Sequence, residues 1–290
     1  MFTIAAALLL VSAVQQSDQQ GQPAVSAPSP ETSPAPSSNS SEIIVEAQRH
    51  LERKVIDTFV GQISQRSENQ IARLHDSVCP VVVGLPDEYA SYIVNRIKVV
   101  ARQLKLRIAR KSNCDANIVL ILATDSAAFV NDVRSNHGGW LAGVASTDID
   151  RLAKPGSPAR AWSATSLRNE DGQPASGGVL IVKSASFIAE PTRQYIDASF
   201  IVIDQTATYG LTLRQIADYA AMRGLARTRE TAAAGGVVSI LSLFDRSTAI
   251  HPQGLSSTDM AYLRALYART GEERAVQERA RIARQIAKAQ

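Results

Sequence analysis

One acidic side chain stands alone on the helix best suited to carry chemistry. Residues 198–226 indicate a buried β-strand, a short turn and an amphipathic helix, and many α/β proteins place their sites where a strand runs into a helix. The predicted helix carries Asp218 but no histidine, cysteine or glutamate, so it lacks the commonest proton-transfer groups. Asp218 is the candidate catalytic acid, although such residues more often face solvent or bond to a neighbouring backbone group.

The spacing on this helix can be aligned with the HExxH pattern of zinc hydrolases, in which two imidazoles one turn apart hold the ion. Ala217 and Ala221 then occupy the ligand positions, Asp218 the acid position and Gly224 a following glycine. The four histidines lie elsewhere and far apart: His50, His75, His137 and His251. The residues therefore predict no metal site and no cofactor, and no GxSxG, P-loop or GxGxxG pattern indicates another familiar reaction.

Local signals define the elements that would position Asp218. Thr212 and Gln215 have the spacing of a capping box, and Gly224 stands where a helix C-terminus favours a left-handed residue. The apolar run at 200–203 suits a central strand buried on both faces. These signals predict a helix of about three turns that follows directly on the strand.

Other apolar runs predict an α/β or α+β fold with a layered mixed sheet and packed helices. Residues 117–123 and 179–183 indicate two more strands, and 191–195 a short helix. A helix is expected directly after 117–123, which repeats the strand-then-helix order. We expect one main domain, because about 250 residues after the N-terminal region suit a single large core.

The N-terminal region reads as an export signal and a tether. Residues 1–13 contain a short apolar run that ends in small residues, as in a signal peptide, although cleavage after Ala13 is left open. Residues 14–41, rich in Gln, Ser, Pro and Ala, are expected to be a disordered linker. Residues 42–290 form the expected domain, whose segment 138–178 we expect to be a long irregular loop. These features predict a periplasmic or secreted protein that does not span a membrane after cleavage.

Three further sets of side chains are candidates for bonding or binding. Cys79 and Cys114 could form a disulfide in an oxidising compartment, or remain two buried thiols. The candidate binding residues of the 138–178 loop are Trp140 and Trp162, which could equally pin an exposed insertion to the body. A basic helix face with no intervening acid could meet an anionic partner, or be an ordinary solvated face; its candidate binding residues are Arg96, Arg102 and Lys105.

The sequence resembles two groups of proteins. The segments VCPVVVGLP, SNCDANIVLILATD, LRQIADYAAMRGLA and DMAYLRALYA, in this order, are similar to uncharacterised exported proteins of alphaproteobacteria, a resemblance that implies no established activity. The strand, the helix and the later SSTDMAYLRALYA also distantly resemble a zinc-peptidase scaffold whose metal ligands have been replaced. The second resemblance implies a fold and not a reaction.

Two hypotheses about function follow from these observations. The first is an exported, non-catalytic binding or scaffold protein of the cell envelope, whose partner is an anionic envelope component or another envelope protein. The alternative is an envelope hydrolase with a non-standard site near the 138–178 loop and Asp218. The modest net charge of +4 and the aromatic content of only 5% argue against a nucleic-acid partner.

Overall fold

The computed structural model describes residues 52–110, 114–183, 190–229, 237–245, 247 and 251–289. The predicted signal peptide, 1–13, and linker, 14–41, lie outside the described residues. A first helix covers 52–63. The elements that follow are β1 (Pro80–Val83), α2 (Asp87–Gln103), β2 (Ile118–Ala123), α3 (Ser126–Asn136), η1 (Gly138–Leu141), α4 (Ser146–Ala153), β3 (Ala159–Asn169), β4 (Thr192–Asp204), η2 (Gln205–Thr208), α5 (Leu213–Leu225), η4 (Ile240–Ser242), α6 (Ser257–Tyr267) and α7 (Ala275–Ala289).

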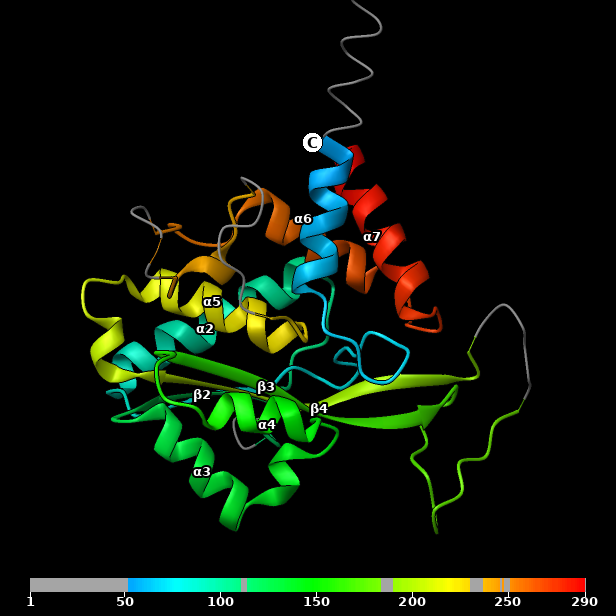
Figure 1. Cartoon of the computed structure of the whole chain (residues 1–290), viewed down its shortest axis with the longest axis horizontal. Helices are drawn as coiled ribbons and strands as arrows, with labels where there is room; N and C mark the ends of the chain where they lie inside the picture. The colour runs from blue at the N-terminus through cyan, green and yellow to red at the C-terminus, as the bar shows by residue number, and fades with distance from the viewer. Residues whose placement is uncertain are drawn as a thin grey trace, which may run out of the picture. The chain divides into compact units, whose positions relative to one another are not determined.

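A four-stranded mixed sheet in the order β1-β2-β4-β3 forms the centre of the domain. β1, β2 and β4 are parallel, whereas β3 runs antiparallel to β4 at the edge. β4 is longer than β2, so residues 192–197 extend with β3 as a two-stranded arm beyond β2 (Figure 1). On its other side this part of β4 forms a short parallel bridge between Tyr195 and Arg73. The expected layered mixed sheet with packed helices is confirmed.

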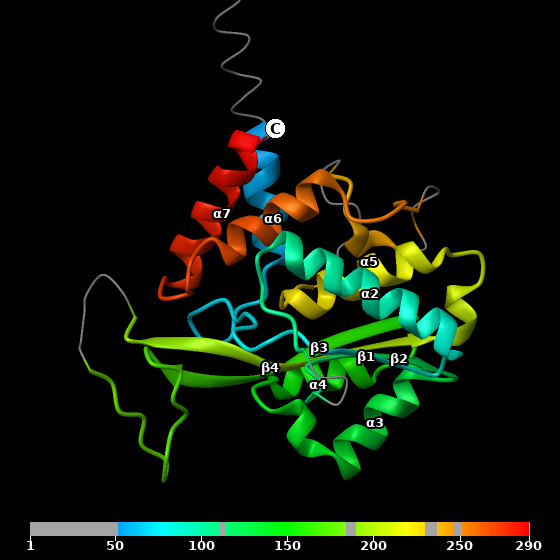
Figure 2. The same ribbon diagram turned by 180° about the vertical axis from the view of Figure 1, so that it is seen from behind.

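Helices cover both faces of this sheet and create two separate cores. α2 and α5 lie on one face and α3 and α4 on the other, as Figures 1 and 2 show from opposite sides. Alternate side chains of β4 divide between them, as the period of a strand requires. Ile201 and Ile203 join the larger core with α5, while Phe200 and Val202 join the smaller core with α3. A site built on one face is therefore separated from the other by the sheet.

α5 begins as predicted, but Gly224 does not end it. The Thr212 hydroxyl accepts a hydrogen bond from the backbone N–H of Gln215, and the side-chain oxygen of Gln215 accepts one from the backbone N–H of Thr212. The predicted capping box is therefore confirmed. The expectation of a left-handed Gly224 is wrong, because the helix continues to Leu225 and Gly224 has no positive φ. A Cβ at Gly224 would lie 2.6 Å from Cγ2 of Ile118. Glycine is needed here because α5 packs closely on β2.

Several local predictions between 138 and 195 are wrong. The expected irregular loop contains η1, α4 and β3, an eleven-residue edge strand. The strand predicted at 179–183 is absent from the described residues there, where Val179 and Ile181 are 63% and 76% exposed. The helix predicted at 191–195 is instead the start of β4. β3 alternates small, polar and charged residues, so it lacks the continuous apolar run that identified β2 and β4.

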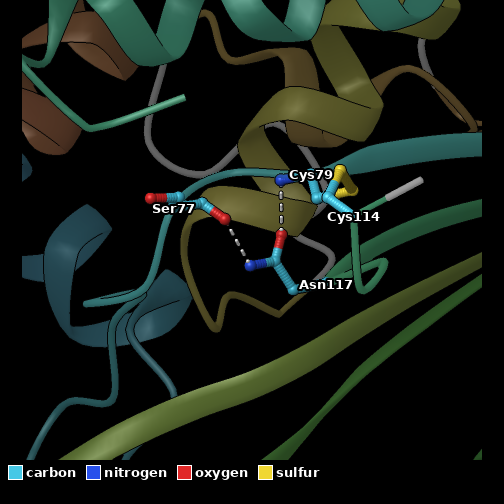
Figure 3. The surroundings of a disulfide bond; sticks show 4 residues. All are labelled: Ser77, Cys79, Cys114 and Asn117. Atoms are coloured by element: carbon cyan, nitrogen blue, oxygen red, sulfur yellow. Dashed lines mark hydrogen bonds between the residues drawn. A yellow bond between two sulfur atoms is a disulfide. The ribbon is translucent and has the colours of Figure 1, made fainter. Parts of the chain in front are cut away.

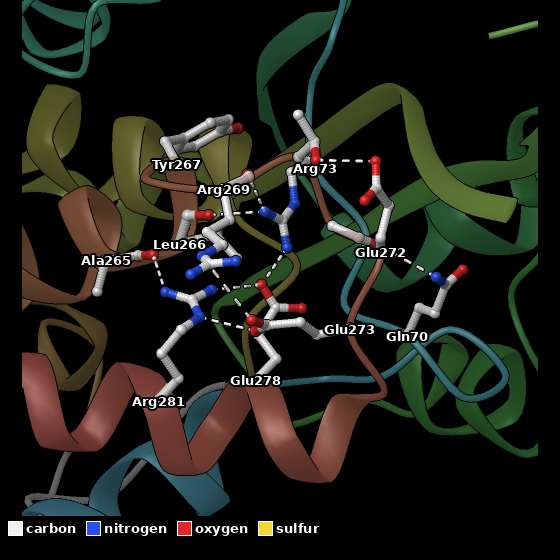
Figure 4. A network of polar contacts seen from close by, with 12 residues as sticks. Gln70, Arg73, Ala265, Leu266, Tyr267, Arg269, Glu272, Glu273, Glu278 and Arg281 are labelled. Carbon is white, nitrogen blue, oxygen red and sulfur yellow. Dashed lines mark hydrogen bonds and ion pairs between the residues drawn. The ribbon is translucent and has the colours of Figure 1, made fainter. Parts of the chain in front are cut away.

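A buried arginine joins the segment before β1 to the two C-terminal helices. Arg73, 1% exposed, donates to the backbone oxygens of Leu266 and Arg269 at the end of α6, and it pairs with the carboxylate of Glu278 on α7. Arg281 pairs with the same carboxylate at 3.1 Å (Figure 4). Guanidinium groups suit this role because their planar fork reaches several oxygens at once. The network fixes segment 64–78 against helices made some 200 residues later in the chain.

Cys79 and Cys114 form a disulfide, as predicted. The bond ties the residue before β1 to the segment that leads into β2, over a sequence separation of 35. The amide of Asn117 supports the same corner, because its Oδ1 accepts from the backbone N–H of Cys79 and its Nδ2 donates to the Ser77 carbonyl (Figure 3). None of the described helices combines the length and the apolar character that crossing a bilayer requires.

Candidate functional site

The candidate acid Asp218 lies fully buried in an ion pair. Its Oδ1 accepts from Nε of Arg96 at 2.6 Å, and its Oδ2 accepts from Nη2 of Arg96 at 3.1 Å and from the backbone N–H of Leu255 at 3.0 Å. The side chain of Arg214 lies 3.8 Å away. Both carboxylate oxygens therefore bond within the protein, and they join α5 to α2 and to the loop before α6. The geometry is that of a structural carboxylate.

The two alanines that align with zinc ligands pack into the larger core. Ala217 and Ala221 are each 0% exposed and lie among the apolar side chains of that core. The described residues contain no group of three or more His, Cys, Asp or Glu side chains that could hold a metal ion. At these positions the side chains provide apolar packing between α5 and its neighbours.

Both tryptophans lie at the smaller core, on the face of the sheet away from α5: Trp162 is part of it, and Trp140 stacks on its Phe200. Their rings stack on Phe200 of β4, with centroid distances of 5.0 Å for Trp140 and 5.3 Å for Trp162. Nε1 of Trp162 donates to the Trp140 carbonyl at 2.9 Å, and His137 stacks against Trp140 as well. Trp140 keeps 40% of its surface exposed. The rings share one cluster, but the sheet separates them from Asp218.

Of the three residues predicted for the basic binding face, one is already ion-paired within the protein. Arg96 is held by Asp218, with a quarter of its side-chain surface exposed. Hydrogen bonding to this carboxylate raises the pKa of Arg96 above its ordinary value, against the opposing effect of burial. Arg102 and Lys105 are exposed at the end of α2, where Lys105 has a positive φ of 60°. Among the predicted cations, these two remain available to a partner.

His75 is the one described histidine with a strongly displaced pKa. Its ring stacks on Tyr195 with a centroid distance of 4.1 Å, and the Arg168 guanidinium lies 4.4 Å from the centroid of the tyrosine. Burial, followed by the charges of Arg73 and Arg193, lowers the pKa of His75 from 6.5 to about 4. The imidazole is therefore neutral at neutral pH.

A second set of side chains, which sequence reasoning did not find, surrounds a cavity of about 350 Å³ beside the edge strand. We call this cavity the arginine pocket. The end of α4, the start of β3 and the segment after α5 provide its walls. Its lining comprises Gln65, Arg151, Leu152, Ser157, Ala159, Arg160, Ala161, Arg223, Thr228 and Arg229. Four of these ten residues are arginines and none is acidic.

Backbone pairing fixes the wall that follows α5. The segment 226–229 runs antiparallel to the chain at 63–65, with the N–H of Gln65 bonded to the Arg227 carbonyl at 3.1 Å. The N–H of Arg229 bonds to the Ile63 carbonyl at 2.8 Å. This short pairing leaves the Arg229 side chain exposed at the rim, while Thr228 is only 4% exposed. The pocket wall is therefore part of the rigid core and not a free loop.

Three arginines around this pocket are buried without a carboxylate partner among the described residues. Arg160, Arg223 and Arg227 are 3%, 5% and 5% exposed. Arg160 donates to carbonyls that include those of Leu152 and Lys154 and to a serine hydroxyl.

Arg223 and Arg227 also bond to uncharged oxygens. Arg223 donates to the carbonyls of Thr228 at 2.6 Å and Ala161 at 3.0 Å, and Arg227 to that of Gly143 at 3.3 Å. Burial lowers the pKa of Arg227 below its ordinary value, an effect opposed by Asp148 and reinforced by Arg229. Buried charges normally require a counter-charge, so these guanidinium groups indicate a site for an anion.

Hydrogen-bonding capacity is left over at the same place. Within the described part of the chain, Nε of Arg223 and Oγ1 of Thr228, which line the pocket, are buried without a hydrogen-bond partner, as is Nη1 of Arg227, which does not line it. Asp148, whose charge acts on Arg227, accepts from Gln65 at 2.8 Å and from Arg151 at 2.8 Å. Glu230 follows in the sequence but lies outside the described residues. The pocket thus combines positive charge with free donors.

A signal for this pocket was present in the sequence. The run RGLARTR places Arg223, Arg227 and Arg229 within seven residues, at and directly after the end of α5. The other arginines come from a region expected to be a loop, so their proximity depends on β3, which was not predicted. Comparison of the chain with protein-family models, with curated proteins and with solved structures gave no match.

Proposed function

We propose that this protein is a non-catalytic binding protein that holds an anionic ligand in the arginine pocket. The observation that carries the proposal is the burial of Arg160, Arg223 and Arg227 with only uncharged oxygens as described partners. Bringing a cation out of water costs several kcal/mol unless a counter-charge is close. An anion bound in the pocket supplies that counter-charge and accepts bonds from Arg223 and Thr228, the two lining residues with unpartnered donors.

The edge strand β3 does not support peptide cleavage beside the pocket, because its backbone groups there are not free to pair with a peptide substrate. An exposed edge strand can pair with an extended peptide through its free backbone groups. In β3 the Ala161 carbonyl accepts from Arg223, the Ala159 carbonyl accepts from Ser157, and the N–H of Thr165 donates to a carbonyl before α4. The protein's own groups thus occupy the edge beside the pocket. The alternative of an envelope hydrolase gains no geometric support among the described residues, since Asp218 and the tryptophans lie on opposite faces of the sheet.

We also propose that the protein acts in the cell envelope, with an anionic envelope component as its ligand. The apolar N-terminal run and the disulfide support this location, since disulfides persist mainly in oxidising compartments. The exposed Arg102 and Lys105 could add a second, weaker contact to the same component. The resemblance to exported proteins of alphaproteobacteria agrees with this proposal.

Ligand-dependent thermal stabilisation tests the proposed function. The variant pair R151Q and R229Q removes two rim charges that do not hold the fold together, and R264Q removes an exposed arginine on α6 as a matched control. Inorganic phosphate or sulfate should raise the melting temperature of the wild type and of R264Q in a saturable manner, since a ligand that binds the native state stabilises it. The rise should be absent or much smaller in the double variant. An equal rise in all three proteins would refute a site at the arginine pocket.

A further inference from the structure

We infer that the group bound in the arginine pocket is a doubly charged phosphate monoester and not a carboxylate. This inference rests on the proposed function and specifies its ligand. It follows from the charge of the pocket, from the kinds of donor that line it, and from its size and opening.

The net charge of the pocket favours a dianion. Its lining contributes four positive charges, and the adjacent Asp148, bonded to Arg151 and Gln65, contributes one negative charge. The balance is therefore 4 − 1 = +3, before the buried Arg227, next to Thr228 in the sequence, is added. A carboxylate would neutralise one of these charges, whereas a phosphate monoester carries about −1.5 to −2 near pH 7. The dianion leaves less uncompensated charge at a site that is partly removed from water.

The donors favour a ligand with several oxygens around one centre. Nε of Arg223 and Oγ1 of Thr228 are buried, line the pocket and have no partner among the described residues. The exposed side chains of Arg151, which pairs with Asp148, and of Arg229 complete the lining. Donors from several side chains suit the three terminal oxygens of a phosphate group, each of which accepts strong hydrogen bonds. A carboxylate offers two oxygens in one plane and would leave more donors unsatisfied.

The size and opening of the pocket indicate that the phosphate belongs to a larger molecule. A volume of about 350 Å³ lies within the range of pockets that hold small organic ligands. The buried donors come from α5 and the residues directly after it, whereas Arg151 and Arg229 are exposed to solvent. A phosphate monoester would therefore enter with its charged end inward and its organic part toward solvent. Both a soluble phosphate ester and a phosphomonoester lipid headgroup have this chemistry.

Titration calorimetry with a small set of anions tests the inference. The probes are glycerol 3-phosphate, sulfate and acetate at pH 7.5 and pH 5, with the full chain in each case. Glycerol 3-phosphate should bind at least tenfold more tightly than acetate at pH 7.5. Its affinity should fall about tenfold at pH 5, because its second pKa is near 6 and it becomes a monoanion. Sulfate stays a dianion and should lose little affinity; the ten lining residues include no histidine that would titrate in this range.

A single substitution separates ligand contact from structural support. Thr228→Val removes the unpartnered buried hydroxyl and keeps the shape of the side chain. It should weaken binding of glycerol 3-phosphate five- to tenfold while leaving the melting temperature unchanged or higher. The control Thr206→Val, at an exposed position in η2, should change neither quantity. If T228V binds like the wild type, the hydroxyl does not contact the ligand and the inference fails.

The outcomes distinguish this inference from the proposed function. Acetate binding as tightly as the phosphate ester would overturn the phosphate assignment and leave an anion-binding protein. Failure of all three anions to bind would overturn both proposals. Vesicles with and without phosphatidic acid identify the source: preferential binding to the acidic vesicles assigns the site to a lipid headgroup, and binding of glycerol 3-phosphate alone assigns it to a soluble ester.

Discussion

Replacing Asp218 by asparagine tests whether this carboxylate is a structural group. The substitution keeps the size of the side chain but removes the charge that faces Arg96. An asparagine amide must also direct its NH2 group toward Arg96 or the N–H of Leu255, and both of these are donors. We expect D218N to destabilise the protein strongly, because a buried donor group then loses its acceptor.

The magnitude follows from the exposure of the two partners. Removing one member of a fully buried ion pair costs about 3–5 kcal/mol. Asp218 is fully buried but the Arg96 side chain is 25% exposed, so water partly compensates the arginine and we expect about 3 kcal/mol. With a urea dependence of about 2–3 kcal/mol per molar for a domain of this size, the unfolding midpoint should fall by about 1 M.

Urea unfolding followed by circular dichroism measures this loss. The matched control is D150N, in which the same substitution removes an ion pair with Arg134 whose partners are 57% and 55% exposed. Exposed pairs contribute less than about 1 kcal/mol, so D150N should unfold close to the wild type. If D218N unfolds at the same urea concentration as D150N, the structural role assigned to Asp218 is wrong and the acid becomes a candidate for chemistry again.

Three further predictions concern the core and its pH dependence. The double variant C79S/C114S should lose about 4 kcal/mol of unfolding free energy, from the chain-entropy cost of a 35-residue separation; a loss below 1 kcal/mol in urea unfolding would contradict this. The pKa of His75 is about 4 in the folded protein and 6.5 in the unfolded chain, so its contribution to stability is complete above pH 6.5 and decreases toward pH 4. After allowance for partial exposure, the unfolding free energy should be about 1–2 kcal/mol lower at pH 5. H75Q should lose this dependence when its unfolding is compared at pH 5 and above pH 6.5. G224A should destabilise by about 1–2 kcal/mol through overpacking, whereas G61A, with open space around its Cβ, should be neutral or stabilising; thermal unfolding that shows the same sign for both would disprove the packing argument.

The elements that could be predicted were those whose local signal agrees with their surroundings. β2 and β4 contain continuous apolar runs because helices cover both faces of the sheet there. α5 and its capping box were predictable because the cap depends on neighbouring residues alone. The disulfide was predictable only as one of two alternatives, since pairing depends on the distance between residues far apart in sequence.

The remaining features depended on tertiary contacts. β3 was missed because this edge strand beside the arginine pocket contains Arg160 and two serines, which interrupt an apolar pattern. Gly224 was assigned to a helix end because its true reason, the approach of Ile118, lies on another element. Asp218 and Arg96 were treated as separate candidates, although they bond to each other across 122 residues.

The ion pair between Arg73 and Glu278 has a consequence for the order in which the molecule can assemble. The two residues are 205 positions apart, and the carboxylate lies on the last helix. During translation the arginine exists long before its partner, so the segment that carries it cannot settle into the interior until synthesis is almost complete. The buried setting of this segment should consequently be completed only after α7 has been synthesised.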